Sequence, residues 1–528
     1  MGFARAHTVA LQGAVGHLID VQADVSPGQV GTTLVGRADP TLSEGRDRVR
    51  MAIVNSRLEW PATRRITVLL SPADLPKTGT HYDLAIAVAV LAAVDVVPRG
   101  TLDGTAFLGE LSLDGGLRPV AGVLPMVLAA SRRGVRCVVV PEPQAREASM
   151  VPGMVVLGMR SLAQVVAELR GEEVPGAPPV PEPAAQSYLG WRGQSRLEEL
   201  DMADLVGMRE AKFAAEVAAA GGHHLLLTGP KGCGKTSLAE RIPGILPDLG
   251  QEESVELTAI RSLAGTLDPA AGLVSRPPYS APHHDATKAS LVGGGTGRVQ
   301  PGLISQAHGG VLFLDEFPLF RTDVIDALRE PLENGDITIA RGEEAVTLPA
   351  RAMVVLASNP CPCGNNVAAT GHLCTCRPSE IRAYNRRVRG PIVDRIDITR
   401  ALQPPTPGDG DALERRESSD TVRARVLAAR ERQLDRFRGA GWRLNGQAPG
   451  SALRERWRLT PAADEALVSA VVNGSLTRRG AVRVHRLAWT VADLAGVDRP
   501  GVGEVMSALA LRSGDPLRHD VIEAVRAG

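Results

Sequence analysis

The sequence predicts an α/β protein with three parts: an N-terminal α/β domain, a parallel sheet and a helical C-terminal domain. Residues 1–170 alternate short β-rich runs with apolar helical segments, which is typical of an α/β or α+β domain. Residues 201–402 contain buried-strand patterns separated by helical stretches, which predicts a doubly wound parallel sheet. From residue 403 to residue 528 the apolar spacing becomes helical, so we expect a helical domain there.

Each expected element rests on its own apolar pattern. In the N-terminal domain we expect strands at 66–70 and 137–140 and helices at 84–93 and 123–131. In the second domain we expect buried strands at 223–228, 310–314 and 353–357. Between these domains, the stretch from Gly171 to Pro183 carries five prolines and no periodicity. We therefore interpret residues 171–200 as a Pro-rich linker.

Composition is typical of a globular protein and limits the classes of partner. Of the 528 residues 44% are hydrophobic, which excludes disorder of the whole chain. The 59 Lys and Arg residues balance 59 Asp and Glu residues, which argues against a uniformly basic nucleic-acid binder but not against local patches. The longest apolar run, 84–94, is shorter than the about 20 residues that a membrane span needs. With no signal-peptide pattern and only six cysteines, we expect a cytoplasmic location.

A glycine-rich loop directly follows the expected strand at 223–228. In such a loop, backbone N–H groups wrap the phosphates of a nucleotide. Lys235 would reach the β- and γ-phosphates of ATP, and the hydroxyl of Thr236 would coordinate Mg²⁺. The residues that match the pattern G-x-x-x-x-G-K-[ST] are Gly229, Pro230, Lys231, Gly232, Cys233, Gly234, Lys235 and Thr236.

Two acids end the next buried strand, 310–314, about 80 residues after the loop. Because parallel strands end at the same edge of a sheet, Asp315 and Glu316 should lie beside the phosphate loop. We expect Asp315 to hold Mg²⁺ and Glu316 to polarise the attacking water. Asn359 ends the following strand and would orient the same water. The sequence therefore predicts ATP hydrolysis.

The order of these motifs, followed by the stretch Gly390 to Asp397, resembles AAA+ ATPases of the magnesium-chelatase-like group. Four longer stretches resemble the ComM/YifB family specifically; they lie at 276–295, 301–320, 327–341 and 358–364. The resemblance also includes stretches of the N-terminal domain and of the C-terminal tail, at 71–93, 107–125 and 483–496. It therefore spans nearly the whole chain.

The resemblance implies a ring, usually a homo-hexamer, with ATP bound at the subunit interfaces. Arg395 matches the arginine finger that reaches a neighbour's γ-phosphate, and Arg479 matches the second sensor arginine of the helical lid. Both roles suit the planar, permanently charged guanidinium group. For each residue the alternative is an ordinary surface arginine in a chain that has 54 of them.

The N-terminal domain resembles the Lon protease domain but departs from its catalytic pattern. Where that family has its serine nucleophile, this chain has His81, and the stretch after Gly115-Gly116-Leu117 contains Arg118 and no lysine. Without nucleophile or base, peptide hydrolysis has no mechanism. We expect a non-proteolytic module that serves assembly or guides a substrate.

Four of the six cysteines cluster in two C-x-C pairs. Cys361, Cys363, Cys374 and Cys376 could close a tetrahedral zinc site that stabilises a short loop. The alternative is four reduced thiols in a Gly/Asn-rich insertion.

Local charge bears on nucleic-acid binding. Residues 376–459 contain 19 arginines and 11 acids, an excess that fits either phosphate binding or a solvated helical face. Loops expected to line the pore of a ring hold Lys288, in 283–297, and Arg341, in a hairpin at 336–351 with Gly342 at its turn. Because only 3% of residues are aromatic, backbone tracking is favoured over base stacking.

The sequence thus favours an AAA+ motor that acts on branched or single-stranded DNA without sequence preference. The family resemblance implies branch migration during recombination and natural transformation. Two alternatives stay open: a magnesium-chelatase-type remodelling subunit, and an ATP-dependent assembly chaperone. No D-x-S-x-S metal-adhesion pattern is found in the chain, which counts against the first of these.

Overall fold

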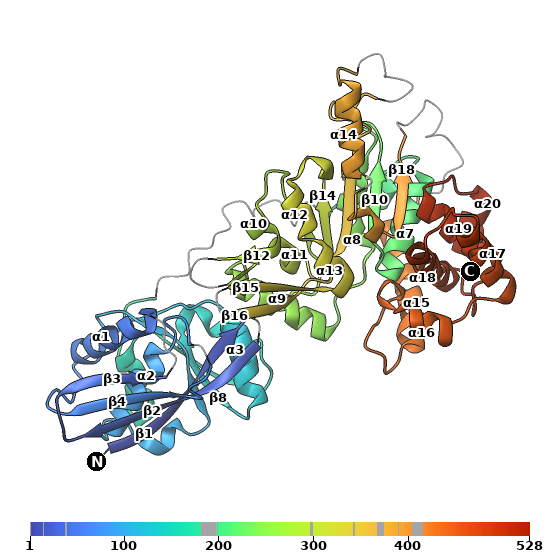
Figure 1. Cartoon of the computed structure of the whole chain (residues 1–528). Coiled ribbons are helices and arrows are strands. Elements are labelled where there is room, and N and C mark those ends of the chain that lie inside the picture. The colour runs from blue at the N-terminus through green and yellow to red at the C-terminus, as the bar shows by residue number, and fades with distance from the viewer. Residues whose placement is uncertain are drawn as a thin grey trace.

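The computed structural model describes residues 2–13, 15–36, 40–75, 77–180, 197, 199–295, 299–341, 344–366, 374–388, 390–403 and 416–527. An N-terminal α/β body, a central sheet with its helices and a C-terminal group of helices follow one another along the molecule (Figure 1). Among the described residues, no helix is both long enough and apolar enough to cross a membrane.

The N-terminal body is a mixed seven-stranded sheet with helices on both faces, in the strand order β3-β4-β2-β1-β5-β8-β9. Alternate residues of its strands point to opposite faces; thus Ala4, Ala6 and Ala10 pack under α2 while Val9 packs under α3. Its strands are β1 (Gly2–Gln12), β2 (Val15–Ser26), β3 (Gly31–Val35), β4 (Arg65–Ser71), β5 (Thr105–Phe107), β8 (Cys137–Pro141) and β9 (Val155–Met159), and β6 (Glu110–Leu111) pairs with β7 (Leu117–Arg118). Its α-helices are α1 (Pro40–Asn55), α2 (Asp83–Ala93), α3 (Val123–Arg132), α4 (Ala145–Ala148) and α5 (Leu162–Arg170).

The central body is a five-stranded, entirely parallel sheet in the order β11-β14-β17-β10-β18. Its strands are β11 (Tyr279–Ser280), β14 (Val311–Leu314), β17 (Met353–Ser358), β10 (Leu225–Thr228) and β18 (Ile398–Ala401). Because the strands are buried on both faces, they are continuous apolar runs. Leu225 and Leu227 join a core with α7, α8 and the C-terminal helices, whereas Leu226 joins the core on the other face. The predicted doubly wound parallel sheet is thus present.

Helices, a short strand pair and one hairpin cover this sheet. The α-helices are α7 (Arg209–Gly221), α8 (Lys235–Ile245), α9 (Gln251–Ala264), α10 (Lys288–Val292), α11 (Leu303–Gln306), α12 (Thr322–Asp326), α13 (Arg329–Asn334) and α14 (Pro378–Val388). The strand pair is β12 (Gly293–Gly294) with β13 (Gln300–Pro301), and the hairpin is β15 (Asp336–Arg341) with β16 (Glu344–Pro349). The hairpin expected at 336–351 is confirmed; Gly342 and the side chain of Arg341 lie outside the described residues.

The C-terminal region is helical, as predicted. Its α-helices are α15 (Ser419–Arg436), α16 (Gly450–Glu455), α17 (Pro461–Val472), α18 (Arg478–Leu494), α19 (Val502–Ser513) and α20 (His519–Ala527). Helices α15, α18 and α19 share the core that lies under α7 and one face of the central sheet. The C-terminal helices are therefore packed directly on the central body (Figure 1).

One predicted strand needs correction, and one strand was not predicted. The strand expected at 223–228 begins at Leu225, because the backbone N–H of His224 is bonded to the carboxylate of Asp397 instead of a strand neighbour. Strand β18 was not predicted, since Ile398–Ala401 is short and alternates apolar and polar residues. Over its residues 171–180, the expected linker contains no helix or strand.

The N-terminal body meets the central body through α3, α4 and α9. Glu147 of α4 is buried, and its carboxylate accepts hydrogen bonds from the Ser262 hydroxyl of α9 and from the Leu124 N–H of α3, 2.9 Å long in the second case. A buried carboxylate is stable only when such donors satisfy it. Burial raises the pKa of Glu147 in spite of these bonds. One buried side chain thus joins elements of both bodies.

Candidate nucleotide site

The phosphate loop runs from the end of β10 to the start of α8, as its sequence predicts. Gly229 has φ +155°, and a Cβ atom there would lie 2.4 Å from the carbonyl oxygen of Leu402. Gly234, with φ +86°, adopts the left-handed conformation that turns the chain into α8. The loop therefore ends at the N-terminus of an eleven-residue helix, where free N–H groups and the helix dipole favour an anion.

A chain of hydrogen bonds links the predicted phosphate-binding residue Lys235 to two of the predicted catalytic residues, Asn359 and Glu316. The amino group of Lys235 donates to the side-chain oxygen of Asn359 over 3.0 Å, and to the carbonyl oxygens of Gly229 and Pro230 over 2.8 Å each. Asn359 in turn donates to a carboxylate oxygen of Glu316 over 2.8 Å. Lys235 and Asn359 are 7% and 5% exposed, so these bonds lie in a largely water-free environment, where they are strong.

The predicted magnesium ligands also meet. The Thr236 hydroxyl donates to a carboxylate oxygen of Asp315 over 3.0 Å, so two hard oxygen donors lie together, as Mg²⁺ requires. Glu316 has φ +47°, an uncommon conformation for a residue with a side chain, which is often found at functional sites. The hydrogen bond from its N–H to Asp315, 2.9 Å long, supports this turn.

Two loop residues make contacts of another kind. Cys233 is 2% exposed, with its sulfur 3.7 Å from the Lys235 nitrogen, in keeping with a small packing residue. Lys231 lies over the turn at Gly364, where an added Cβ atom would come within 2.8 Å of its side chain. The phosphate loop therefore contacts the segment that carries the cysteines.

The four clustered cysteines converge as the spacing suggested. Their sulfur atoms all lie within 4.8 Å of one another. The Sγ–Sγ distances are 3.4 Å for Cys361 and Cys363, 3.6 Å for Cys363 and Cys374, and 3.8 Å for Cys361 and Cys374. Zinc–sulfur bonds of about 2.3 Å in a tetrahedron place sulfur atoms about 3.8 Å apart, so the cluster fits such an ion. A hydrogen bond from the N–H of Asn365 lowers the pKa of Cys363 to about 6, whereas desolvation and hydrogen bonds to Cys363 and Cys361 raise the pKa of Cys374 and of Cys376. The fit to zinc therefore rests on the sulfur positions.

One residue behind the site was missed by the sequence reasoning. Tyr384 of α14 is buried, and its hydroxyl oxygen accepts the backbone N–H of Asn359 over 3.3 Å. Burial raises the pKa of Tyr384, so the phenol stays neutral. In the same helix, Arg387 donates to the carbonyl oxygen of Pro318 over 2.8 Å, two residues beyond Glu316. No motif marks this helix; only its place directly after the cysteines could have suggested it.

Arg395 lies at the opposite edge of the sheet from the phosphate loop. It is the last residue of η7 (Val393–Arg395), just before β18 begins, and it forms a 2.6 Å ion pair with Glu333 of α13. Only 16% of its side chain is exposed. In its own chain the described structure does not bring Arg395 to Lys235, Glu316 or Asn359.

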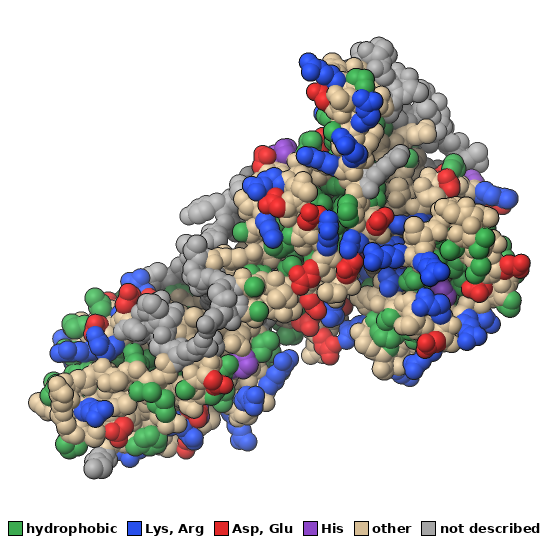
Figure 2. Space-filling model, in the orientation of Figure 1, with side chains coloured by type: hydrophobic (Ala, Val, Ile, Leu, Met, Phe, Trp, Pro, Cys, Tyr) green, Lys and Arg blue, Asp and Glu red, His purple; other side chains and the backbone are tan. Residues whose placement is uncertain are grey.

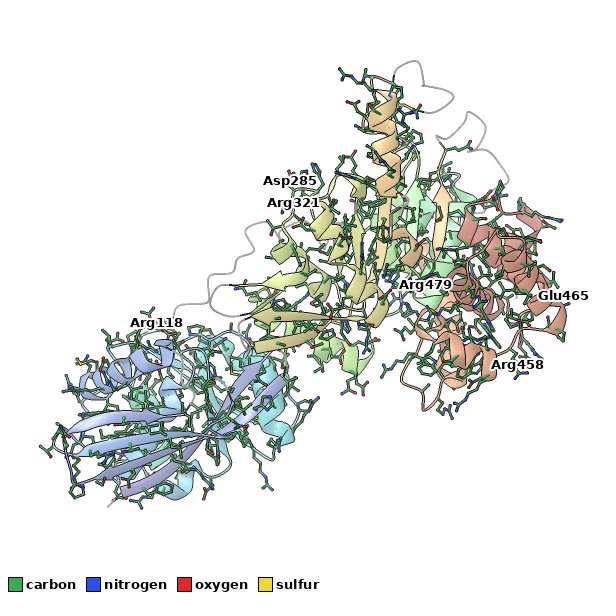
Figure 3. The ribbon with its side chains drawn as sticks, viewed as in Figure 1. Arg118, Asp285, Arg321, Arg458, Glu465 and Arg479 are labelled. Atoms are coloured by element: carbon green, nitrogen blue, oxygen red, sulfur yellow. The ribbon has the colours of Figure 1, made fainter. Side chains whose placement is uncertain are left out.

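Helices of the C-terminal region hold the segment after Arg395. Arg483 of α18 donates to the Arg395 carbonyl over 2.9 Å and to Asp397 over 2.6 Å. Burial alone would raise the pKa of Asp397, but the bond from His223 and the charge of Arg483 hold it far below its usual value. Arg479, one turn before Arg483, is exposed in the first turn of α18, next to the central body (Figure 3). Arg395 and Arg479 thus lie on the same side of the sheet.

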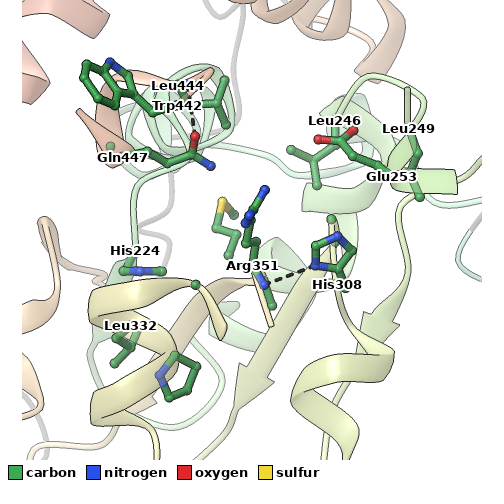
Figure 4. Close-up of a pocket in the computed structure, with 18 of the residues that line it drawn as sticks. His224, Leu246, Leu249, Glu253, His308, Leu332, Arg351, Trp442, Leu444 and Gln447 are labelled. Atoms are coloured by element: carbon green, nitrogen blue, oxygen red, sulfur yellow. Dashed lines mark hydrogen bonds between the residues drawn. The ribbon is translucent and has the colours of Figure 1, made fainter. Parts of the chain in front are cut away.

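A pocket of about 280 Å³ opens at this same edge, between the core and the segment after α15. Its lining residues include His224, Glu333, Arg351 and Trp442. They do not include the phosphate loop, Asp315, Glu316 or Asn359. In Figure 4 the N–H of Arg351 is bonded to Nδ1 of His308, 3.2 Å away. The pocket is therefore separate from the nucleotide site.

The protease-like positions of the N-terminal body are closed off. His81 is 6% exposed, and its ring nitrogen Nε2 lies 2.8 Å from the carbonyl oxygen of Val9. Lys77 is fully buried and donates to the carbonyl oxygen of Pro72. Arg118 is exposed on the outer surface (Figure 3). These side chains do not form a nucleophile–base pair.

Much of the arginine excess at 376–459 has a structural role. Arg425 pairs with the buried Glu216, Arg436 with the buried Asp493, and Arg430 donates to the carbonyl oxygen of Ala219. Among the expected pore residues, Lys288 is exposed at the first position of α10. The excess charge is thus divided between buried pairs and exposed side chains.

Sequence models of three protein families match the chain. They are "Magnesium chelatase, subunit ChlI" at residues 201–408, "Subunit ChlI of Mg-chelatase" at 21–144 and "Magnesium chelatase, subunit ChlI C-terminal" at 416–512. A weaker similarity, 24% over 170 residues and 29% of this chain, links it to Lon protease 2 of Bacillus subtilis.

Full-length relatives place the chain more closely. An uncharacterized protein of Mycobacterium tuberculosis is 46% identical over 517 residues, with 97% of this chain and 99% of the relative covered. The uncharacterized protein YifB of Escherichia coli is 38% identical over 98% of both chains. The competence protein ComM of Haemophilus influenzae is 37% identical over 97% of this chain and 98% of its own length. The chain therefore belongs to the ComM/YifB family of magnesium-chelatase-like AAA+ ATPases, whose members use a nucleotide and Mg²⁺.

Proposed function

We propose that the protein is a ring-forming motor that hydrolyses ATP to remodel DNA. The observation that carries the ATPase part is the chain of hydrogen bonds from Lys235 through Asn359 to Glu316. These groups come from three different segments, and they meet at the end of a phosphate loop. Chance would not bring a cation, an amide and a carboxylate into this order beside a helix N-terminus.

Each group has a role that its position supports. Lys235 would bind the β- and γ-phosphates, and Thr236 and Asp315 would hold Mg²⁺, which would supply positive charge beside the phosphates. Glu316 orients and polarises the attacking water, and Asn359 holds Glu316 in place through the 2.8 Å bond. The γ-phosphate competes with Asn359 for the Lys235 amino group, so ATP binding would release Asn359 toward the water.

We further propose that Arg395 and Arg479 act on the nucleotide of a neighbouring subunit. Both lie on the side of the sheet away from their own phosphate loop. In a head-to-tail ring, such a surface meets the next subunit's nucleotide site. A guanidinium supplied from a neighbour stabilises the charge on the transferring phosphoryl group. A homo-hexamer is the assembly that we propose.

DNA is the proposed substrate, in branched or single-stranded form, and branch migration is the proposed action. The similarity to a competence protein over nearly the full length supports it. Exposed Lys288 and the β15–β16 hairpin are proposed pore contacts to the DNA backbone. The alternatives are a chelatase-type remodelling subunit and an assembly chaperone.

Zinc is the metal that we propose for the cluster of Cys361, Cys363, Cys374 and Cys376. The sulfur separations of 3.4 to 3.8 Å support it. Purified protein should carry about one zinc per subunit by mass spectrometry of the metal content, because four thiolates bind this ion tightly at neutral pH. Cys363→Ser should lower that content and Cys137→Ser should not. Finding no metal in freshly purified protein would remove the zinc proposal.

A junction assay tests the motor function most directly. The protein is mixed with a labelled four-way DNA junction, with a single strand or with no DNA, and both ATP hydrolysis and junction products are measured. We expect DNA to stimulate hydrolysis and ATP to drive conversion of the junction. If hydrolysis occurs but no DNA binds or stimulates it, the DNA function is wrong and the chaperone or chelatase alternative gains support.

A further inference from the structure

Helix α14 projects from the top of the central body, away from both neighbouring bodies (Figure 1). It begins two residues after Cys376 and runs over Pro378–Val388. Only one of its residues, Tyr384, is buried. Basic side chains gather on this projection in the space-filling view (Figure 2). Burial of apolar side chains thus contributes little to the position of α14, and its exposed face is open to a partner.

The two faces of α14 differ in what they carry. With 3.6 residues per turn, Tyr384 and Arg387 lie on one face and Arg382 and Arg386 lie on the opposite one. The first face reaches the nucleotide site, through the bonds of Tyr384 to the Asn359 N–H and of Arg387 to the Pro318 carbonyl. On the opposite face, Arg382 and Arg386 are exposed, and neither has a partner in the part of the chain that the structure describes.

We propose that the outer face of α14 binds the phosphate backbone of nucleic acid through Arg382 and Arg386. This inference rests on the proposed DNA function and names a second contact for it, outside the pore. Residues four apart on a helix are separated by about 6 Å along its axis. At about 3.4 Å per phosphate along a duplex axis, two phosphates that are two nucleotides apart on one strand are separated by about the same distance.

The composition of this face favours nucleic acid over a protein partner. Its exposed side chains are polar or small and include no large apolar group; they are Ser379, Arg382, Ala383, Asn385 and Arg386. Protein interfaces are built around buried aromatic or aliphatic side chains, and this face offers none. Phosphate contacts require only exposed cations. Glu380, the one acid of α14, lies four residues before Tyr384 and so on the other face, where its carboxylate accepts the N–H of Arg377 over 2.8 Å.

The inner face of α14 then couples this contact to hydrolysis. The Asn359–Glu316 bond joins two segments, and α14 is bonded to the backbone of each. Tyr384 accepts the N–H of Asn359 itself, and Arg387 donates to the carbonyl oxygen of Pro318, two residues after Glu316. The cysteine cluster, which ends at Cys376, ties the start of the helix to the segment after Asn359. Nucleic acid bound to the outer face thus acts, through α14, on the side chains that orient water. Tyr384 and Arg387 are positioning residues in this scheme.

Charge reversal of the outer face tests the binding step. We expect R382E/R386E to weaken binding of a fluorescent single strand about ten-fold or more, and to reduce the slope of log affinity against log salt by about 1.4, the value for two lost phosphate contacts. R382Q/R386Q should give a smaller loss in affinity. The matched control is R132E/R133E, at the end of α3, where both arginines are exposed.

The outcomes separate this inference from the proposed function. If wild-type protein binds no DNA, the DNA function itself fails. If wild type binds DNA and R382E/R386E binds equally well, or if R132E/R133E weakens binding as much, only the α14 contact is wrong. Loss of ring assembly in R382E/R386E with unchanged DNA binding would make α14 a subunit interface and overturn the proposal.

A second variant tests the coupling. Y384F/R387M keeps the bulk of both side chains and removes their hydrogen bonds to the nucleotide site. We expect DNA affinity within two-fold of wild type but several-fold less stimulation of hydrolysis by DNA. Unchanged stimulation would show that α14 does not transmit the contact.

Discussion

The two edges of the central sheet carry polar groups in opposite arrangements. At the carboxyl-terminal edge, Lys235, Asn359 and Glu316 bond to one another within one chain. At the amino-terminal edge, Arg395 has no phosphate loop beside it and pairs with Glu333. The first edge brings together the groups of the proposed nucleotide site, whereas the second carries the arginine that we propose acts on a neighbour's nucleotide. Under this proposal, hydrolysis depends on both edges, supplied by two subunits.

Support from the C-terminal helices distinguishes the edges further. In the part of the chain that the structure describes, the hydrogen bonds of Lys235, Thr236 and Asn359 are made with segments of the central body. The segment around Arg395 is held by α18 through Arg483 and by α19 through Arg512, which donates to the Ile396 carbonyl. A movement of the C-terminal helices would thus shift Arg395 before it shifts the phosphate loop. The four predictions below test this contrast, from the largest expected effect to the smallest.

Loss of Arg395 should have the largest effect. Arg395→Ala should lower ATP hydrolysis by assembled rings about 10³-fold, since a guanidinium from a neighbour contributes at least that much in related phosphoryl-transfer sites. ATP affinity, measured with a fluorescent analogue, should change little because the binding residues lie at the other edge. Arg458→Ala, on an exposed arginine of the C-terminal region, is the control. Hydrolysis within a few-fold of wild type in Arg395→Ala would contradict a trans role.

Loss of the Glu316 carboxylate should come next. Glu316→Gln keeps the shape of the side chain and its hydrogen bond to Asn359 but cannot polarise water. We therefore expect turnover to be slower by about 10²-fold or more. ATP should stay bound, and the ATP-bound ring should accumulate. Single-turnover kinetics separates binding from chemistry here. Normal turnover in this variant would mean that another group activates the water.

Acid should destabilise the amino-terminal edge. Burial lowers the pKa of His224 to about 4, beside Asp397, His223, Arg483 and Arg486. Its folded pKa is below the unfolded value of about 6.5, so its contribution to stability is present above pH 6.5 and is lost as pH falls toward 4. The ring is only half-buried at the pocket wall, where water screens part of the cost, so we expect a loss of about 2 kcal/mol.

Thermal unfolding at pH 7 and pH 4.5 measures this loss. His224→Asn keeps an acceptor for the N–H of Val354, which the ring now bonds over 3.1 Å, but it cannot be protonated. The decrease in unfolding temperature between the two pH values should be smaller in this variant. An equal decrease in both proteins would assign the acid sensitivity to other groups.

The smallest expected effect concerns the Arg395–Glu333 pair. Arg395 must leave Glu333 to reach a phosphate, and a pair whose carboxylate is half exposed contributes about 1 kcal/mol or less. Glu333→Gln should therefore raise hydrolysis by rings two- to five-fold. Slower hydrolysis would instead mean that Glu333 orients Arg395 for its reaction.

The sequence predicted one edge of the sheet far better than the other. The phosphate loop, Asp315, Glu316 and Asn359 each follow a buried apolar strand, and the parallel arrangement brings strand ends together whatever the loops do. Contacts such as Tyr384 with Asn359, or Arg483 with Asp397, join residues 25 and 86 positions apart. No local pattern encodes them, because they depend on how separate helices pack.

Short elements and arginine roles were also beyond the sequence. Strand β18 has four residues and includes Arg400, which is 2% exposed and bonded to the carbonyl of Asp515. A charged side chain in such a run counts against a buried strand unless its partner is known. In the same way, local charge at 376–459 could not separate Arg425, in a buried pair, from Arg386, which is exposed.

Mixing two inactive variants tests the shared site most directly. Lys235→Ala lacks a working phosphate loop and Arg395→Ala lacks the guanidinium, so each alone should be inactive. In rings assembled from equal amounts of both, about one interface in four joins an intact loop to an intact Arg395, if assembly is random. We therefore predict hydrolysis at about one quarter of the wild-type rate. A mixture as inactive as its parts, with mixed rings demonstrated, would contradict a site built from two subunits.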